Sequence, residues 1–292
     1  MKPRRSWLFV PGADAAAQVA AERSAADVLI QELEDFTPPE LRPQARRLAG
    51  TLYDRWRAAG KVAAVRVNPL EGDGLADLGA VLAGRPDVVL MSKVIAPEQV
   101  RALEAATGGA VELVPNIETA AGLVRAVEIA KASRRVVAML VASEDMVADL
   151  GTGRSRGGVE LAWVRQKFLV DCRAVGVEPI DAPWTFSDAK GAALDAKWAR
   201  KMGYRMKSLV SPAHAQAINA ALTPSAVELA KARRIVVAFE KARASGLERA
   251  KVDGKLVEVP IYLAAKRLVQ EHAQRAGLSA GHKPPPRRRK RG

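Results

Sequence analysis

The chain has 292 residues, enough for one large domain or two ordinary ones, so length alone does not decide the number of domains. Hydrophobic residues make up 49% of it and charged residues 27%, which is typical of a globular protein with a large core. No segment approaches the roughly 20 consecutive apolar residues of a membrane helix, and the N-terminal segment lacks the apolar region of a signal peptide. Because Cys172 is the single cysteine, an internal disulfide framework is excluded, and we expect a cytoplasmic protein.

The formal net charge of +14 is partly concentrated near the C-terminus. Residues 283–292 read KPPPRRRKRG and carry six positive charges, which leaves +8 for the rest of the chain. A proline-rich run followed by a block of like charges cannot bury a core. We therefore expect a disordered basic tail over residues 279–292, with weak, salt-sensitive contacts to polyanions. A charge of +8 on the remainder is compatible with a phosphate-bearing substrate such as a coenzyme A thioester.

Short β-rich runs alternate with amphipathic helical patterns along most of the chain. Strands are predicted over residues 7–10, 28–33, 62–67, 88–93, 111–117, 136–141, 178–181 and 207–210. Helical patterns between them cover residues 39–59, 97–106, 119–132, 160–175 and 187–201. Several strands are continuously apolar, as parallel strands covered on both faces are. Eight such repeats predict an α/β fold closed into a (β/α)₈ TIM barrel over residues 1–222, and no G-x-G-x-x-G follows the first strand to favour an open sheet.

Residues 223–278 follow a different pattern. Thr223 and Pro224 are typical of a helix start, and a long helix is predicted over residues 224–244. Asp253-Gly254 is a hairpin turn signal within residues 251–260, and a last helix is predicted over residues 261–276. Since this segment is too small to hold much core alone, we expect a helical lid that packs on its own barrel or on a neighbouring subunit.

Charged residues follow the predicted strands, where a barrel of this type places its active site. The successive strand ends carry Glu34 with Asp35, Arg66, Lys93, Glu118, Asp145 and Asp181. Acidic groups that gather at one mouth resist ionisation unless a cation lies among them, and Mg²⁺ is the cation that a few carboxylates hold. Zinc is disfavoured because the three histidines have no ligand spacing. Each carboxylate could instead cap the helix that follows it, and the joint placement at successive strand ends is what favours a site.

The sequence also resembles a known family. Residues 5–12, RSWLFVPG, are similar to the opening segment of the citrate lyase beta-subunit-like proteins, which belong to the HpcH/HpaI aldolase/citrate lyase superfamily. Further similarities follow in the same order: LED at 33–35, VRVN at 65–68, MSKV at 91–94, IETAAG at 117–122, SEDMVADLG at 143–151, ID at 180–181 and SPAHAQAIN at 211–219. Together the motifs cover about residues 5–270.

The resemblance implies a Mg²⁺-dependent carbon–carbon lyase that cleaves or forms a 3-hydroxyacyl thioester, such as malyl- or citramalyl-coenzyme A, with a 2-oxo acid as the other product. It also implies a homotrimer or hexamer. Glu118 and Asp145 match the two metal ligands of the family, and Arg66 matches an arginine that contacts the substrate's carbonyl oxygens. Asp35, with Glu34 beside it, matches an acidic pair near the metal's waters.

Glu258 lies in DGKLVE at 253–258, which is similar to the lid segment of the family and implies a role as general acid/base, although the usual residue there is Asp. Arg5 and Lys93 are, with Arg66, the predicted substrate-binding residues. A coenzyme A pocket near the N-terminal basic residues would distinguish a thioester lyase from an aldolase of free acids, and the sequence does not show one clearly. The sequence departs from the family at Phe36, where small residues are usual, and at Ser211, where histidine is usual. These departures leave the acyl group and the oxo acid open.

Two alternatives stay open beside the thioester lyase. A metal-dependent aldolase that acts on free 4-hydroxy-2-oxo acids would use the same metal site. A protein of another class would bind polyanions or nucleic acid through the Arg-rich tail, although the barrel has no aromatic stacking run or recognised motif for base readout.

Overall fold

The computed structural model describes residues 3–109 and 111–275, so the predicted tail and the last residue of the predicted final helix lie outside the described residues. The chain divides into two compact units. One is Arg4–Leu222, and the other begins at Thr223 and includes Pro3. Among the described residues, none of the helices has the length and apolar character needed to cross a membrane.

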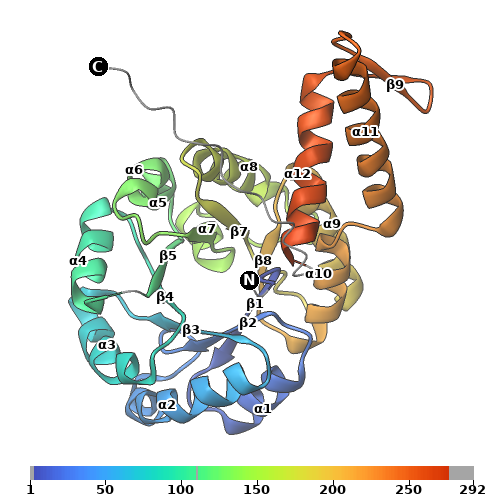
Figure 1. Ribbon diagram of the computed structural model, residues 1–292. Coiled ribbons are helices and arrows are strands. Elements are labelled where there is room, and N and C mark those ends of the chain that lie inside the picture. The colour runs from blue at the N-terminus through green and yellow to red at the C-terminus, as the bar shows by residue number, and fades with distance from the viewer. Residues whose placement is uncertain (1–2, 110, 276–292) are drawn as a thin grey trace, which may run out of the picture. The chain divides into compact units, whose positions relative to one another are not determined.

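The first unit is a closed parallel barrel with its helices outside, as Figure 1 shows. The strands run in sequence order around it: β1 Ser6–Pro11, β2 Val28–Glu32, β3 Val62–Val67, β4 Val88–Met91, β5 Glu112–Ile117, β6 Ala138–Val141, β7 Glu178–Asp181 and β8 Met206–Leu209. The barrel closes where β8 pairs with β1, with Trp7 opposite Ser208. The predicted (β/α)₈ fold is therefore confirmed.

The outer layer consists of helices that connect the strands. They are α1 Ala15–Arg23, α2 Arg42–Ala58, α3 Leu75–Val81, α4 Pro97–Thr107, α5 Ala120–Val124, α6 Ala126–Lys131, α7 Glu144–Asp149, α8 Val159–Ala174, α9 Ala189–Met202 and α10 Ala215–Leu222. Short 3₁₀ turns cover Pro39–Leu41, Leu82–Gly84 and Pro212–His214, and a π turn covers Leu70–Gly74. The caps follow sequence chemistry: the Asp188 carboxylate accepts from the Gly191 N–H at the start of α9, and Gly203 ends that helix with φ +117°.

Alternate residues of each strand enter two different apolar cores. Trp7, Phe9, Ile30 and Leu140 belong to the cluster inside the barrel. Their neighbours, such as Leu8, belong to the larger cluster between strands and helices. Because both faces of each strand are buried, the strands are continuously apolar, which explains the runs that the sequence shows. This alternation also decides which charged residues at the strand ends point into the mouth of the barrel.

Two of the differences between predicted and observed elements have an identifiable cause in the backbone. The fourth strand ends at Met91 and not at residue 93, because Lys93 adopts φ +55°, a left-handed conformation that no strand continues through. The helix predicted over residues 119–132 is divided into α5 and α6, since Arg125 has φ −99° and ψ +10°. The first of these departures lies in the candidate site.

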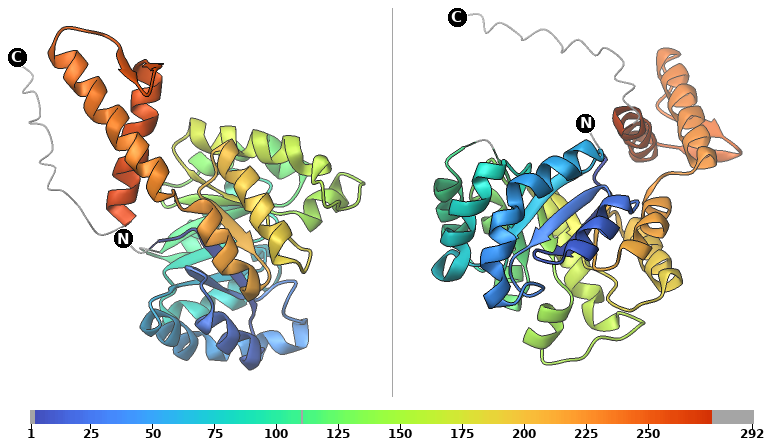
Figure 2. Two further views of the ribbon diagram at one scale, coloured as in Figure 1. Left: turned by 90° about the vertical axis from the view of Figure 1, so that its right-hand side faces the viewer. Right: turned by 90° about the horizontal axis from the view of Figure 1, so that it is seen from below.

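The second unit contains two helices joined by a hairpin, visible in both views of Figure 2. Its elements are α11 Ala226–Ala244, β9 Ala250–Val252, β10 Lys255–Val257 and α12 Val259–Arg275. The turn at Asp253 and Gly254 has φ +48° and +75°, as the Asp-Gly pair predicts. Phe239 and Tyr262 stack with ring centroids 4.5 Å apart in a small core of this unit. The lid function of this unit stays a prediction.

Candidate active site

Arg66 lies near the carboxyl end of β3 and is surrounded by three carboxylates. Its Nε is 2.9 Å from Glu32 Oε1, its Nη2 is 3.1 Å from Glu34 Oε2, and its Nη1 is 3.5 Å from Glu118 Oε1. The guanidinium also lies 4.7 Å from the centre of the Phe9 ring. Burial alone would lower the pKa of Arg66, but the three carboxylates outweigh burial and raise it. The side chain is therefore a fixed cation in a site largely closed to water.

Glu32, the last residue of β2, fixes Arg66 and was not among the residues predicted from the sequence. It lies opposite Arg66 in the strand register and is fully buried. Its two oxygens accept from the backbone N–H groups of Glu34 (2.7 Å) and Phe36 (2.6 Å). The alternation of side chains along a strand could have identified Glu32 from the sequence. Ile30 faces the barrel interior, so Glu32, two residues later, must face the same side.

Glu34 and Asp35 form the acidic loop that follows β2, and Lys93 lies beside them. Lys93 Nζ is 2.6 Å from Glu34 Oε1 and 3.6 Å from Asp35 Oδ1. Glu34 is buried, whereas Asp35 is exposed. Burial and, to a smaller degree, Asp35 raise the pKa of Glu34 against the opposing effects of Arg66 and Lys93. The structure thus brings Arg66, Glu34, Asp35 and Lys93 together.

Glu118 follows β5 and is buried beside Arg66. Its Oε2 accepts from the backbone N–H of Lys93 at 3.1 Å, and its Oε1 accepts weakly from the Asn116 side chain at 3.4 Å. Burial is the largest cause that raises the pKa of Glu118 to about 7; Arg66 opposes it, and Glu34 and Asp145 add to it. The cap of α5 is Thr119, whose hydroxyl accepts from the Gly122 N–H, so Glu118 is not a helix cap.

Asp145 is the second residue of α7 and is partly buried. No ion pair joins it to any residue in the part of the chain that the structure describes, and α7 has no side-chain cap. Two oxygens near these carboxylates, Asn116 Oδ1 and Ser143 Oγ, are buried without a hydrogen-bond partner. Buried polar oxygens without a hydrogen-bond partner are rare in folded proteins, unless a ligand or a water molecule binds to them.

The donor set fits a hard divalent cation. Five carboxylates (Glu32, Glu34, Asp35, Glu118 and Asp145) share the neighbourhood with the cations Arg66 and Lys93. Within residues 3–109 and 111–275, no three or more His, Cys, Asp or Glu side chains are arranged so that they could hold a metal ion among themselves. Mg²⁺ commonly takes one or two protein carboxylates and leaves its other positions to water and substrate oxygens, so Glu118 and Asp145 suit it.

Two predicted site residues are not brought to this mouth. Arg5 precedes β1, at the opposite end of the barrel, where its Nε and Nη2 bind the Asp27 carboxylate at 2.8 and 2.9 Å. This ion pair gives Arg5 a structural contact at the start of the strands, and its predicted substrate-binding role stays a prediction. Glu258 belongs to the second unit, where its Oε1 is 3.6 Å from Arg249 Nε. Its role as acid/base stays a prediction.

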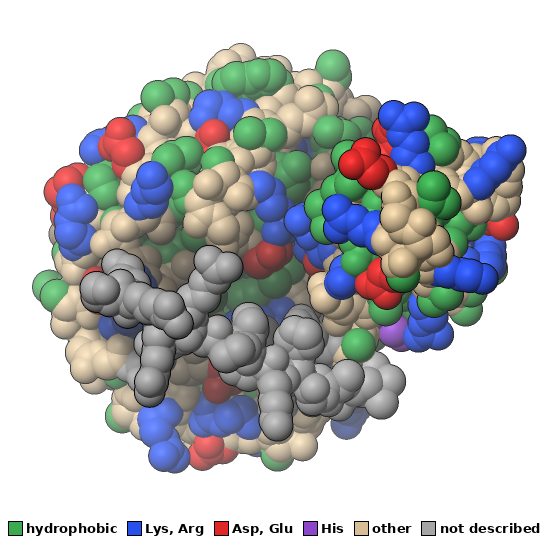
Figure 3. Space-filling view, turned by 45° about the horizontal axis from the view of Figure 1, so that its top comes forward, with side chains coloured by type: hydrophobic (Ala, Val, Ile, Leu, Met, Phe, Trp, Pro, Cys, Tyr) green, Lys and Arg blue, Asp and Glu red, His purple; other side chains and the backbone are tan. Residues whose placement is uncertain are grey.

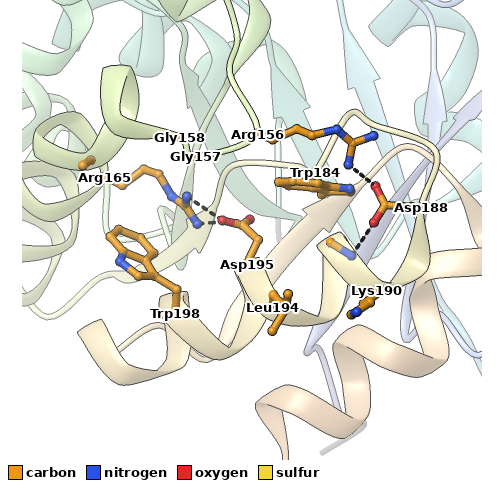
Figure 4. A pocket seen from close by; sticks show the side chains of 12 residues that line it. Arg156, Gly157, Gly158, Arg165, Trp184, Asp188, Lys190, Leu194, Asp195 and Trp198 are labelled. Atoms are coloured by element: carbon orange, nitrogen blue, oxygen red, sulfur yellow. Dashed lines mark hydrogen bonds and ion pairs between the residues drawn. The ribbon is translucent and has the colours of Figure 1, made fainter.

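Asp181 also points away from the mouth, because Ile180 before it faces the barrel interior. Its carboxylate binds Arg165 Nη2 at 2.6 Å and Lys207 Nζ at 2.7 Å. Arg165 binds Asp195 as well, at 2.8 Å. Figure 4 shows this Arg165–Asp195 pair at one side of a separate cavity of about 390 Å³ between α8 and α9, in which Trp184 and Trp198 also lie. Asp181 is therefore part of a structural ion network.

The mouth of the barrel contains a cavity of about 270 Å³. Its lining combines site residues with apolar ones: Phe9, Asp35, Phe36, Arg66, Leu140, Ala142, Ser143, Glu144, Asp145, Pro183, Thr185 and Val210. A cavity of this size beside a fixed arginine and two carboxylates can hold a small carboxylic acid.

Comparison with known proteins identifies the class to which this barrel and site belong. A sequence profile of the family described as HpcH/HpaI aldolase/citrate lyase matches residues 5–212. Citrate lyase subunit beta of Escherichia coli strain K12 is 34% identical over 291 residues, which cover 95% of each chain.

Solved structures of citrate lyase-like proteins are also similar to this chain. Protein CitE from Mycobacterium tuberculosis, in complex with magnesium, acetoacetate and coenzyme A, is 28% identical with a TM-score of 0.75 and covers 94% of this chain and 98% of its own. Citrate lyase beta subunit from M. tuberculosis, complexed with oxaloacetate and magnesium, is 28% identical with a TM-score of 0.64 and covers 76% and 98%. The chain belongs to the HpcH/HpaI aldolase/citrate lyase family, which confirms the predicted resemblance. It is accordingly an enzyme of the lyase class.

Proposed function

We propose that the chain is a Mg²⁺-dependent carbon–carbon lyase that separates or joins a 2-oxo acid and an acyl-coenzyme A thioester. The observation that carries the proposal is the surplus of carboxylates around one buried arginine at the carboxyl end of the barrel. Glu118, with a pKa raised to about 7 chiefly by burial, is poorly compensated without a further positive charge. A divalent cation held by Glu118 and Asp145 would supply that charge.

The relatives support the same assignment. The two similar structures from M. tuberculosis hold magnesium, one with oxaloacetate and the other with acetoacetate and coenzyme A. Glu118, Asp145 and Arg66 of this chain match family motifs in order and lie together at the mouth of the barrel. This coincidence of motif and geometry favours a metal-bound oxo acid as one half of the reaction.

Each residue has a chemical task in this proposal. The bound Mg²⁺ would act as a Lewis acid toward the keto and carboxylate oxygens of the oxo acid. Arg66, fixed by Glu32 and Phe9, donates to the carbonyl oxygen of the thioester and stabilises the negative charge that develops there. Lys93 neutralises Glu34, which keeps the loop beside the metal ligands in place. Glu258 would move the proton at the acyl carbon.

Two finer statements belong to the proposal. The enzyme is expected to work in the cytoplasm as a homotrimer or hexamer, in which the second unit covers an active site. A related aldolase acting on free 4-hydroxy-2-oxo acids would use the same cluster. The two reactions differ in one requirement: the thioester lyase releases an oxo acid from a 3-hydroxyacyl-coenzyme A, whereas the aldolase releases it from the free acid.

The test is calorimetric titration of oxaloacetate, pyruvate and glyoxylate into metal-free protein, with and without Mg²⁺. Binding of at least one oxo acid should require Mg²⁺ and should disappear in Glu118→Ala. Glu128→Ala is the matched control, because Glu128 is an exposed carboxylate that pairs with Arg125 on α6. If every oxo acid binds equally without Mg²⁺, or if none binds in its presence, the proposed metal site is wrong.

A further inference from the structure

The apolar wall of the mouth cavity is built around Phe36, a residue that no part of the proposed mechanism uses. Phe36 lines the cavity together with Phe9, Leu140, Ala142, Pro183 and Val210. Its ring meets that of Phe9 edge-on, with centroids 6.1 Å apart and planes inclined by 68°. The guanidinium carbon of Arg66 also lies 5.9 Å from the centre of the Phe36 ring. Half of the cavity lining is therefore apolar.

The loop that carries Phe36 is held firmly in place. The backbone N–H of Phe36 donates to Glu32 Oε2 at 2.6 Å. The next residue, Thr37, is buried; its hydroxyl donates to the Glu32 carbonyl oxygen at 2.5 Å and accepts from the Gly12 N–H at 2.8 Å. Pro38 and Pro39 follow and fix two further φ angles. The backbone that carries the Phe36 ring is therefore fixed by contacts within the chain.

Most of the charged residues that line the cavity are acidic. Among the twelve described residues that line it, Arg66 is the only cation, while Asp35, Glu144 and Asp145 are acidic. Arg66 already pairs with three carboxylates. The nearby cations do not line the cavity and have carboxylate partners of their own. Lys93 lies 2.6 Å from Glu34 and 3.6 Å from Asp35, and Arg154 lies 2.6 Å from Glu160 and 3.5 Å from Glu144.

These residues surround the part of a bound oxo acid that lies beyond its keto group. Its 2-oxo-carboxylate end would bind the metal held by Glu118 and Asp145, while Arg66 serves the carbonyl oxygen of the thioester. A second carboxylate would then lie among Asp35, Glu144 and the Phe36 wall without a free cation, and an unpaired charge is expensive to remove from water. An apolar substituent would instead cover the Phe36 ring and gain from burial.

We propose that Phe36 is a specificity-determining residue, and that the oxo acid of this enzyme is a 2-oxo monocarboxylate with an apolar substituent and not a dicarboxylate. This inference rests on the proposed function, because it names the substrate class of the same site. The cavity of about 270 Å³ leaves room for a substituent of more than one carbon beside the oxo-acid end.

The experiment compares two oxo acids that differ in one group. In 2-oxobutyrate a methyl group stands where oxaloacetate has its second carboxylate. Both are titrated by calorimetry into the full-length protein with Mg²⁺, and pyruvate serves as the shorter reference. The wild-type protein should bind 2-oxobutyrate about tenfold or more tightly than oxaloacetate. Phe36→Leu keeps an apolar wall and should keep this order, whereas Phe36→Arg supplies a cation and should reverse it.

Trp163→Arg is the matched control, since Trp163 is an aromatic residue of α8 that is 65% exposed and does not line the cavity. It should leave the ratio of the two affinities unchanged. Circular dichroism verifies that each variant is folded. Equal or tighter binding of oxaloacetate by the wild-type protein would overturn the inference. A preference that Phe36→Arg leaves intact would overturn the role of Phe36. Binding of none of the three acids would overturn the proposed function itself, and this inference with it.

Discussion

The guanidinium of Arg66 makes a different contact on each of its edges: Glu32 at Nε, Glu34 and Glu118 at the two Nη atoms, and Phe9 against its plane. Lysine has a single nitrogen and cannot satisfy these partners at once. The guanidinium is therefore positioned by the ends of β2 and β5 and by Phe9 of β1, before any substrate binds. Preorganised donors of this kind give the largest electrostatic contributions to catalysis.

Replacing Arg66 by Lys should lower kcat by about 10²–10³-fold while Mg²⁺-dependent binding of the oxo acid persists, because the arginine acts mainly on charge that develops in the transition state. Steady-state kinetics with a 3-hydroxyacyl-coenzyme A and calorimetry with the oxo acid separate the two effects. Arg5→Lys is the control: Arg5 lies at the opposite end of the barrel, so this change should lower thermal stability slightly and leave kcat unchanged. A wild-type kcat in Arg66→Lys would exclude the proposed role.

How much of the site was predictable differed from residue to residue. Glu34, Asp35, Arg66, Lys93, Glu118 and Asp145 were selected because they follow predicted strands or match motifs, and the structure gathers them. Glu32 was missed because it was taken as part of the strand. Arg5 was placed in the site because of its charge, and its partner Asp27 is far enough along the chain that the sequence does not reveal the pair.

Among the elements, β7, β8, α8 and α9 are joined by a buried network of four charged side chains: Arg165, Asp181, Asp195 and Lys207. Lys207 is completely buried, and its Nζ lies 2.7 Å from Asp181 and 2.6 Å from Asp195. Burial by itself would raise the pKa of Asp195, but Lys207 and Arg165 outweigh it and lower the pKa to about 2. Removing one member leaves the others as uncompensated buried charges.

Asp195→Asn should therefore destabilise the barrel by about 3–5 kcal/mol at pH 7. The pKa of this carboxyl is lower in the folded chain than its ordinary value of 3.8, so its stabilisation is fully present above pH 3.8 and is lost as the pH falls toward 2. Urea unfolding of wild type and variant between pH 7 and pH 3 should show the difference shrinking at the acid end. The exposed pair of Glu98 and Arg101 provides a control: Glu98→Gln should destabilise the barrel far less than Asp195→Asn does. If the difference in unfolding free energy between wild type and Asp195→Asn does not change with pH, the proposed role of the Asp195 carboxylate is wrong.

The hairpin between α11 and α12 carries the predicted acid/base. Glu258 is 53% exposed and follows β10 directly. If it moves the proton at the acyl carbon, Glu258→Gln should slow turnover by about 10²–10⁴-fold and leave oxo-acid binding unchanged. Glu258→Asp keeps the carboxyl group and should retain far more activity than the amide.

The direct measurement for Glu258 is solvent hydrogen exchange at the acyl carbon of a coenzyme A thioester, followed by NMR in the presence of Mg²⁺ and an unreactive oxo acid. Asp253→Asn on the same hairpin is the control, because Asp253 lies in the turn, pairs with Arg234 of α11 and should not affect the exchange. Unchanged exchange in Glu258→Gln would assign the proton transfer to another residue.

Elements were easier to predict than their ends. The apolar runs gave all eight barrel strands, since burial on both faces leaves a strong signal in a parallel sheet. The ends depend on the local backbone conformation, such as φ +55° at Lys93. A lysine in the sequence does not predict this conformation. That residue turns its N–H toward Glu118, so the least predictable backbone position lies within the candidate site.

At the scale of the whole molecule, the order of strands and helices predicts closure, because eight successive parallel strands with helices between them bury all edges in a barrel. The strand register cannot be read from the sequence in the same way. Glu32 meets Arg66 because β2 and β3 are aligned residue by residue from Val28 and Val62 onward. A shift by one residue would turn Arg66 away from the mouth.

The net charge of +14 is the other property of the whole molecule, and it supports the alternative of polyanion binding. On the face drawn in Figure 3, Lys and Arg side chains are interspersed with acidic and apolar ones over both units and do not form one continuous basic surface. The densest block of positive charge in the sequence is at residues 283–292, which carry six basic residues. Polyanion affinity should therefore depend on this segment.

Deleting residues 283–292 should abolish retention on heparin at moderate salt and leave Mg²⁺-dependent oxo-acid binding unchanged. In the full-length protein the affinity for duplex DNA, measured by fluorescence anisotropy, should fall linearly in log–log form with salt, with a slope no steeper than about −5, because six charges release at most about 0.9 counterion each. A scrambled tail of the same composition should bind like the wild type, since such contacts carry no sequence information. A steeper slope, or DNA affinity that survives the deletion, would mean that the surface of the folded units binds polyanions too.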